Sequence, residues 1–489
     1  MYLIHVCLDD SGGCILLIFS AKGVTEFQLC TIPVDRVTNL SNFFSSGVAL
    51  GTMRSYFIHF LLIILCVSGT WAGENMPPMN LTVSEAVSMA IQNNTAIRES
   101  AQKYLAANED RLQARADFFP KAVAGYGYTS LEDQPYQKFG VNQVMVGGRE
   151  QHHWDISLIQ TVFRGFALVS RYDMARISQE IADMEHRQTI QDISAEVKKA
   201  CYQALLSKKI EQVANETVLA LSAHEAEADR FYRHGLIPYN DLLKARVARA
   251  AAIQEQEKVR ASAKQIHSRL NILIGNPMDT GITIADTDEI VIPPTNLPAL
   301  VERALRSRPV LAALRLGLEM QEQSIRMAES AYYPELNLIG RYEQNGQDIL
   351  AQTNDYGNDF NMSVSLQARW TFFEWGKTRA ATARQRYEQN AFQERLKSAE
   401  DRIRLETQQA FLDMGVSMAN LNTSREAVDQ ARENYRITRL LYEQQIVNST
   451  EVLDAQTART QAETNYFQAV YGGLTAMTNL EWAIGQKID

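Results

Sequence analysis

Two different spacings of hydrophobic residues alternate along this chain. In 81–117 and in 297–331 the pattern has the three- to four-residue period of amphipathic helices. Directly after each stretch the period changes to two, which is the spacing of a half-buried strand. In the clearest case Trp154, Ile156 and Leu158 are separated by polar side chains. The pattern therefore predicts helices that lead into strands.

The alternating segments form two pairs of predicted strands. The first pair covers 121–130 and 153–163, and the second pair covers 335–343 and 362–373. Polar loops that contain Gly and Asn separate the two members of each pair, as in β-hairpins. We therefore predict two hairpins within a mainly helical protein.

A long run without proline follows each hairpin, over 166–233 and over 377–444. Small and apolar residues keep a three/four spacing there, so each run is expected to be one continuous helix with a coiled-coil seam. Tight turns at 234–240 and 445–450 then reverse the chain into helices of about 38 residues. Each long helix should pack antiparallel beside two shorter helices placed end to end.

The same order of elements occurs twice because the sequence itself is duplicated. Matching segments recur in one order at a nearly constant offset: 116–120 with 330–334, 161–163 with 371–373, 231–245 with 441–455, and 270–275 with 480–485. Self-similarity of this kind defines a structural repeat. We divide the chain into repeat one (81–275), a linker (276–296) and repeat two (297–485).

The predicted strands have the length and chemistry of membrane-spanning β-strands. Each has about 9–11 residues, with one apolar face and aromatic residues near its ends. These aromatic residues are Phe118, Phe119, Phe163, Tyr332, Tyr333, Phe373 and Trp375. The strands of one chain are too few to close a barrel, which needs about eight, so spanning would require several copies. A soluble hairpin packed on helices is the alternative interpretation.

Residues 53–72 have the order of parts that defines a secretory signal peptide. A methionine and an arginine precede an apolar run of about 11 residues, and small residues follow it. The run is too short for a spanning helix, and a buried core helix is the alternative interpretation. Because a signal peptide begins a protein, we interpret Met53 as the true start. Residues 1–52 are then an over-extended N-terminus, and 73–489 is the mature chain.

Composition and charge exclude some functional classes, but they give no indication that part of the chain spans a membrane. The 489 residues are 46% hydrophobic and 21% charged, with a formal net charge of -9. These values alone describe an ordinary soluble α-helical protein, and they give no reason to expect a nucleic acid partner. A wall that is apolar only on alternate residues also keeps average hydrophobicity low, so the strand prediction is unaffected.

The sequence contains no recognisable catalytic or metal-binding motif. A nucleophile elbow, a zinc motif and a Walker motif are all absent. His152 and His153 are expected in a solvated loop, without further ligands at a fixed spacing. Cys201 continues an apolar helix seam and is expected to pack as a small hydrophobic residue. We therefore predict no enzyme, no metal and no cofactor.

Taken together, the strands, the helix turns and the duplication resemble the TolC-type outer-membrane efflux proteins (outer membrane factors) over 78–485. The segments that carry the resemblance are 156–163, 364–376 and 442–455. The resemblance implies a homotrimer in the outer membrane of a Gram-negative bacterium. Its β-barrel would have twelve strands, and an α-helical tunnel would continue it through the periplasm.

The resemblance also implies partners and a function. The implied partners are outer-membrane lipid, a periplasmic adaptor (membrane fusion) protein, and an inner-membrane pump of the resistance-nodulation-division or ABC type. The implied function is the exit duct of a tripartite efflux or type I secretion system, which passes small molecules or unfolded polypeptides to the outside. A periplasmic coiled-coil adaptor or structural protein without a pore is the alternative. Adaptors usually have one helical hairpin, whereas this chain has two.

Members of this family close their tunnel where the helix turns converge. Glu451 and Asp454 match acidic positions that line the constriction there and favour cations. These two residues are three positions apart and so share one helix face. Solvated acids near a helix N-terminus are the alternative, since the helix dipole favours them there.

The resemblance further implies a latch that holds the tunnel closed. Tyr442 matches a latch tyrosine, and Asp241 matches its acidic partner. Gly235 retains the usual turn glycine in the first repeat, whereas Gln445 replaces it in the second. Val447 stands where a basic residue is expected, so the latch is expected to be weaker or built differently.

Overall fold

The computed structural model divides the chain into two units, Met1–Asn75 and Met76–Asp489. The residues that it describes are 2–8, 13–19, 26–28, 79–286 and 296–486. In the first unit, an antiparallel sheet contains β1 (Tyr2–Leu8), β2 (Gly13–Phe19) and β3 (Glu26–Gln28). The predicted start at Met53 and the predicted signal peptide (53–72) lie outside the described residues.

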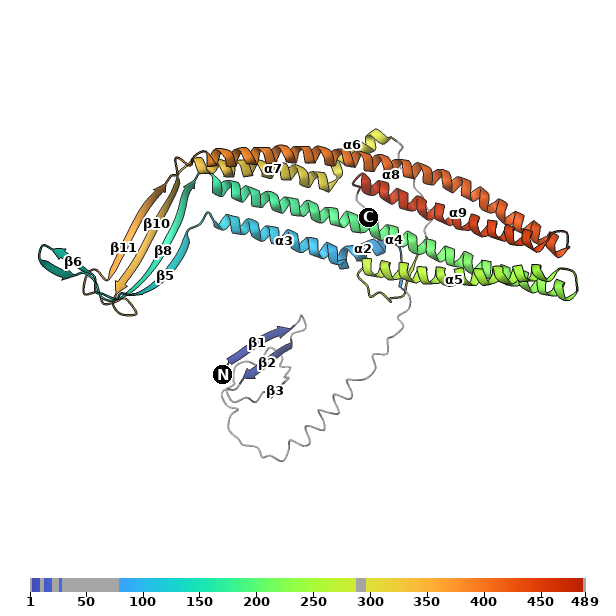
Figure 1. The fold of residues 1–489 in the computed structure, drawn as a ribbon, viewed down its shortest axis with the longest axis horizontal. Helices are drawn as coiled ribbons and strands as arrows, with labels where there is room; N and C mark the ends of the chain where they lie inside the picture. Colours follow the sequence, from blue (N-terminus) through green and yellow to red (C-terminus); the bar gives the residue numbers. More distant parts are fainter. Residues whose placement is uncertain (1, 9–12, 20–25, 29–78, 287–295, 487–489) are drawn as a thin grey trace, which may run out of the picture. The chain divides into compact units, whose positions relative to one another are not determined.

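The second unit repeats one order of elements (Figure 1). Its first half contains β4 (Met79–Leu81), α2 (Val83–Asn93), α3 (Thr95–Ala116), β5 (Lys121–Ser130), β6 (Tyr136–Phe139), β7 (Asn142–Met145), β8 (Glu150–Arg164), α4 (Ala167–Arg233), α5 (Tyr239–Leu273) and β9 (Ile282–Ile284). Its second half contains α6 (Leu297–Ser307), α7 (Pro309–Glu329), η1 (Ser330–Tyr332), β10 (Glu335–Gly346), β11 (Phe360–Arg369), α8 (Lys377–Glu443) and α9 (Ser449–Ala483). Helices α4 and α8 have 67 residues each, and α5 and α9 have 35 each.

The four long strands form one antiparallel sheet in the order β11-β10-β8-β5. Directly paired residues share a face, so the register assigns each side chain to one side of the sheet. One side exposes apolar residues: Ile156, Leu158, Leu338, Met362, Val364 and Leu366. The opposite side carries polar residues: Asp155, Ser157, Arg341, Glu343, Asn361 and Ser363. The sheet thus has the apolar and polar faces that the alternation predicts.

The predicted strand 362–373 is wrong at its C-terminal end, because β11 stops at Arg369. The indole of Trp370 instead donates a hydrogen bond of 3.1 Å to a backbone carbonyl of η1. Trp375 and Gly376 follow with left-handed φ angles of 51° and 82°. These residues turn the chain into α8, so the apolar alternation continues beyond the hydrogen-bonded ladder.

The expectation that His152 and His153 lie in a loop is also wrong, because both belong to β8. His152 is buried, and its Nδ1 lies 2.7 Å from the hydroxyl of Tyr126. The Nδ1 of His153 lies 2.6 Å from Oδ1 of Asn345. Neighbouring residues of a strand point to opposite faces, so the two imidazoles cannot share a ligand. Within the described residues, no group of three or more His, Cys, Asp or Glu side chains is placed to hold a metal ion.

The helical stretches predicted over 81–117 and 297–331 are each broken once. The breaks lie at Asn94, between α2 and α3, and at Arg308, between α6 and α7. The Asn94 side chain accepts a 2.9 Å hydrogen bond from a backbone N–H of α3 and donates one of 2.9 Å to a carbonyl at the end of α5. Arg308 precedes Pro309, whose ring disfavours helical backbone in the residue before it.

The largest hydrophobic core lies midway along the helices, where β4 and β9 pair in parallel. Leu81 and Ile284 from these strands pack with Val87 of α2, Leu270 of α5 and Cys201 of α4. Cys201 is 0% exposed, and burial raises the pKa of its thiol to about 12. The prediction that Cys201 packs as a small hydrophobic residue is therefore confirmed.

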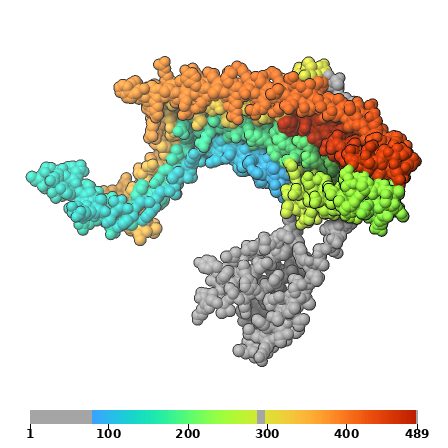
Figure 2. Space-filling view, turned by 45° about the vertical axis from the view of Figure 1, so that its right-hand side comes forward, coloured from blue at the N-terminus to red at the C-terminus, as the bar shows by residue number. Residues whose placement is uncertain are grey.

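The helices form two long antiparallel hairpins. Helix α4 runs beside α3 and then α5, and α8 runs beside α7 and then α9 (Figure 1). Helices α4 and α9 also pack against each other. The α4–α5 and α8–α9 turns therefore lie side by side, and we call this end of the unit the tip (Figure 2). Within the described residues, no helix has a stretch long and apolar enough to cross a membrane.

Candidate functional site

The tip consists of two helix-to-helix turns with the same backbone geometry. After α4, the N–H groups of Gly235 and Leu236 donate to carbonyls three and five positions back, both at 2.9 Å. After α8, those of Gln445 and Ile446 make the same two hydrogen bonds at 2.8 and 2.9 Å. This is the Schellman pattern, which requires a left-handed residue. Gly235 has a φ of 71° and Gln445 a φ of 62°, so the second turn keeps the glycine geometry without the glycine.

Glu451 and Asp454 lie in the first turns of α9, directly after the second turn. The side chain of Asn448 caps the helix by accepting a 3.2 Å hydrogen bond from the N–H of Glu451. Val452 and Ala455 are buried against the rest of the tip, whereas both carboxylates are exposed. Within the described residues, neither carboxylate forms an ion pair. Two unneutralised acids therefore project from one side of α9.

The predicted latch tyrosine, Tyr442, is the centre of a buried aromatic cluster. It is 2% exposed, and its ring centroid lies 4.8 Å from that of His224 and 5.5 Å from that of Phe231. Burial, together with the nearby carboxylates of Glu227 and Asp241, raises the pKa of Tyr442 to about 12. The phenol therefore stays neutral at physiological pH.

Asp241, the predicted partner of Tyr442, has a different ion-pair partner. The ammonium of Lys244, one turn along α5, lies 3.3 Å from the Asp241 carboxylate. The same ammonium donates a 3.0 Å hydrogen bond to the hydroxyl of Thr450 on α9. Lys244 thus supplies a basic contact between the two hairpins, whereas Val447 in the second turn cannot. Among the described residues, no hydrogen bond joins Asp241 to Tyr442.

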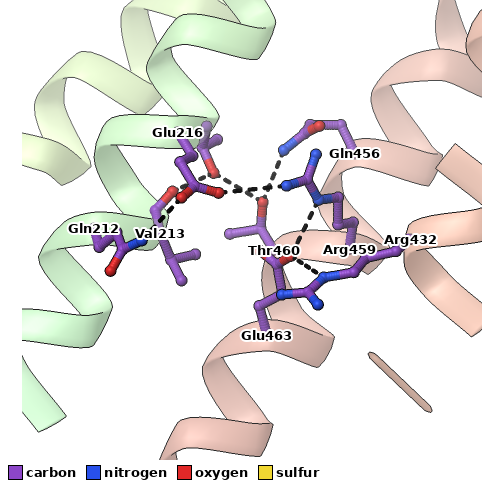
Figure 3. A network of polar contacts seen from close by, with 9 residues as sticks. Gln212, Val213, Glu216, Arg432, Gln456, Arg459, Thr460 and Glu463 are labelled. Carbon is purple, nitrogen blue, oxygen red and sulfur yellow. Dashed lines mark hydrogen bonds and ion pairs between the residues drawn. The ribbon is translucent and has the colours of Figure 1, made fainter. Parts of the chain in front are cut away.

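A polar network lies above the tip and joins three helices (Figure 3). Glu463 of α9 is 3% exposed and accepts hydrogen bonds from Nε of Arg432 at 2.8 Å and from Nε of Arg459 at 3.2 Å. Arg459 also reaches Glu216 of α4 at 3.4 Å. The hydroxyl of Thr217 on α4 lies 3.0 Å from that of Thr460 on α9. The Arg432–Glu463 pair links α8 to α9, and the Arg459–Glu463 pair lies within α9. The contacts with Glu216 and Thr217 link α9 to α4.

Several of these residues were not among the predicted site residues. His224, Lys244 and Ser449 make contacts between helices that are far apart in the sequence, and Glu463 joins α9 to the preceding helix α8. One signal could have identified His224, since it lies three positions after Leu221 and four before Ala228 on the buried seam of α4. A histidine in such a seam requires a partner.

The fold and the tip define a class of protein in which an amphipathic sheet is attached to long helical hairpins. A sequence model described as outer membrane efflux protein matches residues 86–276 and 300–486. The chain therefore belongs to the outer membrane efflux protein family. Its members are channels of the Gram-negative outer membrane, and this protein is an outer-membrane exit duct of an efflux or secretion system.

Similar proteins and structures agree with this family. The outer membrane protein TolC of Vibrio cholerae is 21% identical over 425 residues, which cover 86% of this chain and 92% of that protein. The protein CyaE of Bordetella pertussis is 22% identical over 298 residues, covering 60% of this chain and 61% of that protein. The outer-membrane channel OprN has the same fold, with a TM-score of 0.72 at 18% identity over 83% of this chain and 90% of that chain. VceC from Vibrio cholerae gives 0.70 at 14% identity over 83% and 97%.

Proposed function

We propose that three copies of this chain form one channel, with a closed β-barrel in the outer membrane and a helical tunnel below it. The observation that carries this proposal is the pair of sheet edges. Strands β5 and β11 each have one neighbour in the described sheet, and hydrocarbon tolerates no unpaired strand edge. Pairing β5 of one copy with β11 of the next would remove every edge and give a twelve-stranded barrel.

The two faces of the sheet support the same assembly. The apolar face contains side chains that are exposed in one copy, such as Met362 at 77% and Val364 at 73%, and these would contact outer-membrane lipid. The opposite face includes Arg341, whose Nε donates a 3.2 Å hydrogen bond to Ser157. This polar face would line a water-filled interior.

The helical layer also has two exposed edges. Contacts among the helices give the order α5-α4-α9-α8, which leaves α5 and α8 outermost near the tip. Val247 of α5 is 70% exposed, and Leu412 and Val416 of α8 are 56% and 59% exposed. In a trimer, α8 of one copy would pack against α5 of the next and cover such residues.

At the tip, we propose that Glu451 and Asp454 line the narrowest part of the tunnel. Three copies would give two rings of carboxylates, and such rings favour cations by direct electrostatic attraction. Tyr442 and Asp241 are proposed as latch residues that keep the hairpins together, with Lys244 as an additional contact. The turns at Gly235 and Gln445 would form the end of the tunnel. The absence of ion pairs for Glu451 and Asp454 within the described residues supports a role in the pore.

We further propose the partners that such a duct requires. Family members work in tripartite systems, so a periplasmic adaptor and an inner-membrane pump are expected. The pump would be of the resistance-nodulation-division or ABC type. The family consists of channels, and we assign no enzymatic activity or cofactor to this chain.

We also propose that translation starts at Met53 and that the signal peptide 53–72 is removed. Repeat one (81–275), the linker (276–296) and repeat two (297–485) would then form the mature channel. N-terminal sequencing of protein purified from membranes is expected to begin near Gly73. A mature N-terminus at Met1 would contradict this proposal.

Assembly is tested by expressing the full chain and fractionating the envelope. The protein is expected in the outer membrane, to resist extraction without detergent, and to migrate as a trimer that heating dissociates. Reconstituted into a planar bilayer, it should give discrete single-channel currents. Recovery as a monomer in osmotic-shock fluid, without conductance, would overturn the proposal and favour the adaptor alternative.

A further inference from the structure

His224 is a buried imidazole at the contact between the two hairpins of the tip. It lies on α4 and is 5% exposed. Its Nε2 lies 2.8 Å from the hydroxyl of Ser449, which is the first residue of α9 and is 1% exposed. The other side of the ring packs on Tyr442 of α8. One imidazole therefore contacts both helices of the α8–α9 hairpin from α4.

The surroundings of His224 oppose a positive charge. Burial removes hydration from an imidazolium, and the N-terminus of α9 adds the positive end of a helix dipole beside the ring. Arg439 of α8 adds a further positive charge nearby. Burial and the positive charge of Arg439 lower the pKa of His224 to about 4.

Other charged groups from the packed helices lie around this cluster. They are Glu227 and Arg230 on α4, Asp241 on α5, Arg439 and Glu443 on α8, and Glu451 in the first turn of α9. The pKa of Glu227 is raised by its own burial and by Glu443. None of these acids forms a hydrogen bond or ion pair with His224 among the described residues. The cluster is therefore built around a neutral imidazole.

We propose that His224 is a proton-operated latch, in which protonation of the imidazole weakens the contact between α4 and α9 and favours opening of the tip. This inference rests on the proposed function of the tip as the gate of a channel. When the hairpins separate, the ring is hydrated and its pKa returns toward about 6.5. The open state then binds a proton more readily than the closed state, so acid favours opening.

The pH window follows from this linkage. The closed state is favoured above pH 6.5 and loses its advantage as the pH falls from there toward 4. Between pH 7 and pH 5 the ratio of open to closed protomers should rise by on the order of tenfold. Three copies would make the response of the whole channel steeper.

The experiment is to record the conductance of the reconstituted full-length channel between pH 7 and pH 5. The variant His224→Gln keeps a neutral hydrogen-bonding side chain beside Ser449 and cannot titrate. His224→Leu is a second uncharged variant, for use if the first does not assemble. His267→Gln is the matched control, because burial also lowers the pKa of His267 although it lies on α5 away from the tip. A double variant, Glu451→Gln with Asp454→Asn, removes the titration of these two carboxylates at the start of α9.

The expected result is an acid-induced rise in open probability in the unmodified channel, in His267→Gln and in the Glu451→Gln/Asp454→Asn double variant. The rise should be absent in His224→Gln or His224→Leu. A channel without this response, or a His224 variant that retains it, would overturn the latch while leaving the proposed duct intact. Failure of the unmodified chain to conduct at any pH would instead overturn the proposed function, and the latch with it.

Discussion

Gln445 is a non-glycine residue whose backbone adopts a left-handed conformation that favours glycine. Its left-handed φ of 62° costs a non-glycine residue roughly 1 kcal/mol, whereas the matching Gly235 adopts this conformation freely. We expect Gln445→Gly to raise the free energy of unfolding by about 1 kcal/mol, measured as a higher thermal midpoint of the solubilised protein. Gly235→Ala should lower the midpoint by a similar amount. A lower midpoint for Gln445→Gly would show that the glutamine side chain makes a compensating contact.

Glu463 is the residue on which the polar network depends. Its buried carboxylate neutralises Arg432 and Arg459, and removing that charge leaves two guanidinium groups facing each other. We expect Glu463→Gln to destabilise the α8–α9 hairpin by about 2 kcal/mol, less than for a fully buried pair because Arg432 is half exposed. Urea denaturation provides the measurement. Glu433→Gln, which breaks an exposed pair with Arg436, should leave the urea midpoint nearly unchanged, because water screens this pair.

At the scale of elements, Asn94 determines where α2 ends and α3 begins. Its side chain caps α3 and also bonds to the end of α5, so Asn94→Ala removes two hydrogen bonds at a site that is 6% exposed. We expect a loss of about 1–2 kcal/mol, detected by thermal denaturation together with faster hydrogen exchange at the start of α3. The neighbouring exposed residue provides the control, and Gln92→Ala should have little effect on either measurement.

Most elements were predictable because local patterns encode them. The absence of proline predicted α4 and α8, and strict alternation predicted the long strands. The break at Asn94 was not predictable, since it depends on a carbonyl of α5 that is 179 positions away. The end of β11 was misplaced because Trp370 and Phe372 continue the apolar alternation after the ladder has ended. Alternation of apolar and polar residues indicates which side chains face an apolar environment. The end of a strand depends instead on where its backbone hydrogen bonds stop.

The candidate site also contains residues that the sequence could identify and contacts that it could not. Gly235 and Gln445 were identified as turn residues because the duplication aligns them, and the structure gives both left-handed backbone. The contact between Lys244 and Thr450 could not be predicted, because it depends on which faces of α5 and α9 meet. The same holds for His224 and Ser449. Sequence thus identifies the turns, whereas the contacts between hairpins require the packing of distant helices.

At the scale of the whole molecule, one copy is incomplete at both ends. The sheet has two open edges and one exposed apolar face, and the outer helices of the tip expose Val247 and Val416. The same association of copies would pair the open strand edges and cover the exposed apolar residues of the outer helices, because both lie at the edges of their layers. An average of 46% hydrophobic residues would therefore suit the proposed trimer, in which apolar surface is buried partly by other copies and partly by lipid.

The proposed rings of Glu451 and Asp454 would exist only in such an assembly, so these residues give the most direct test of the proposed pore. Replacing Glu451 and Asp454 together by alanine removes six carboxylates from three copies. Because the negative carboxylates repel anions and attract cations, their removal should lower the cation-over-anion permeability ratio roughly fivefold to tenfold, equivalent to about 1 kcal/mol. The reversal potential in a salt gradient measures this ratio.

A matched control tests whether the effect depends on where the acidic residues lie and not only on the number of charges removed. Glu394 and Asp401 on α8 are exposed as well, but each pairs with a basic residue one turn away, Lys397 and Arg404. Alanine at both positions should leave the permeability ratio unchanged. Trimer content on unheated gels should be equal in the two double variants, since none of these four side chains is buried. Equal selectivity in the tip variant and the unmodified channel would place the constriction elsewhere, whereas a loss confined to the tip variant would locate the selective ring at the start of α9.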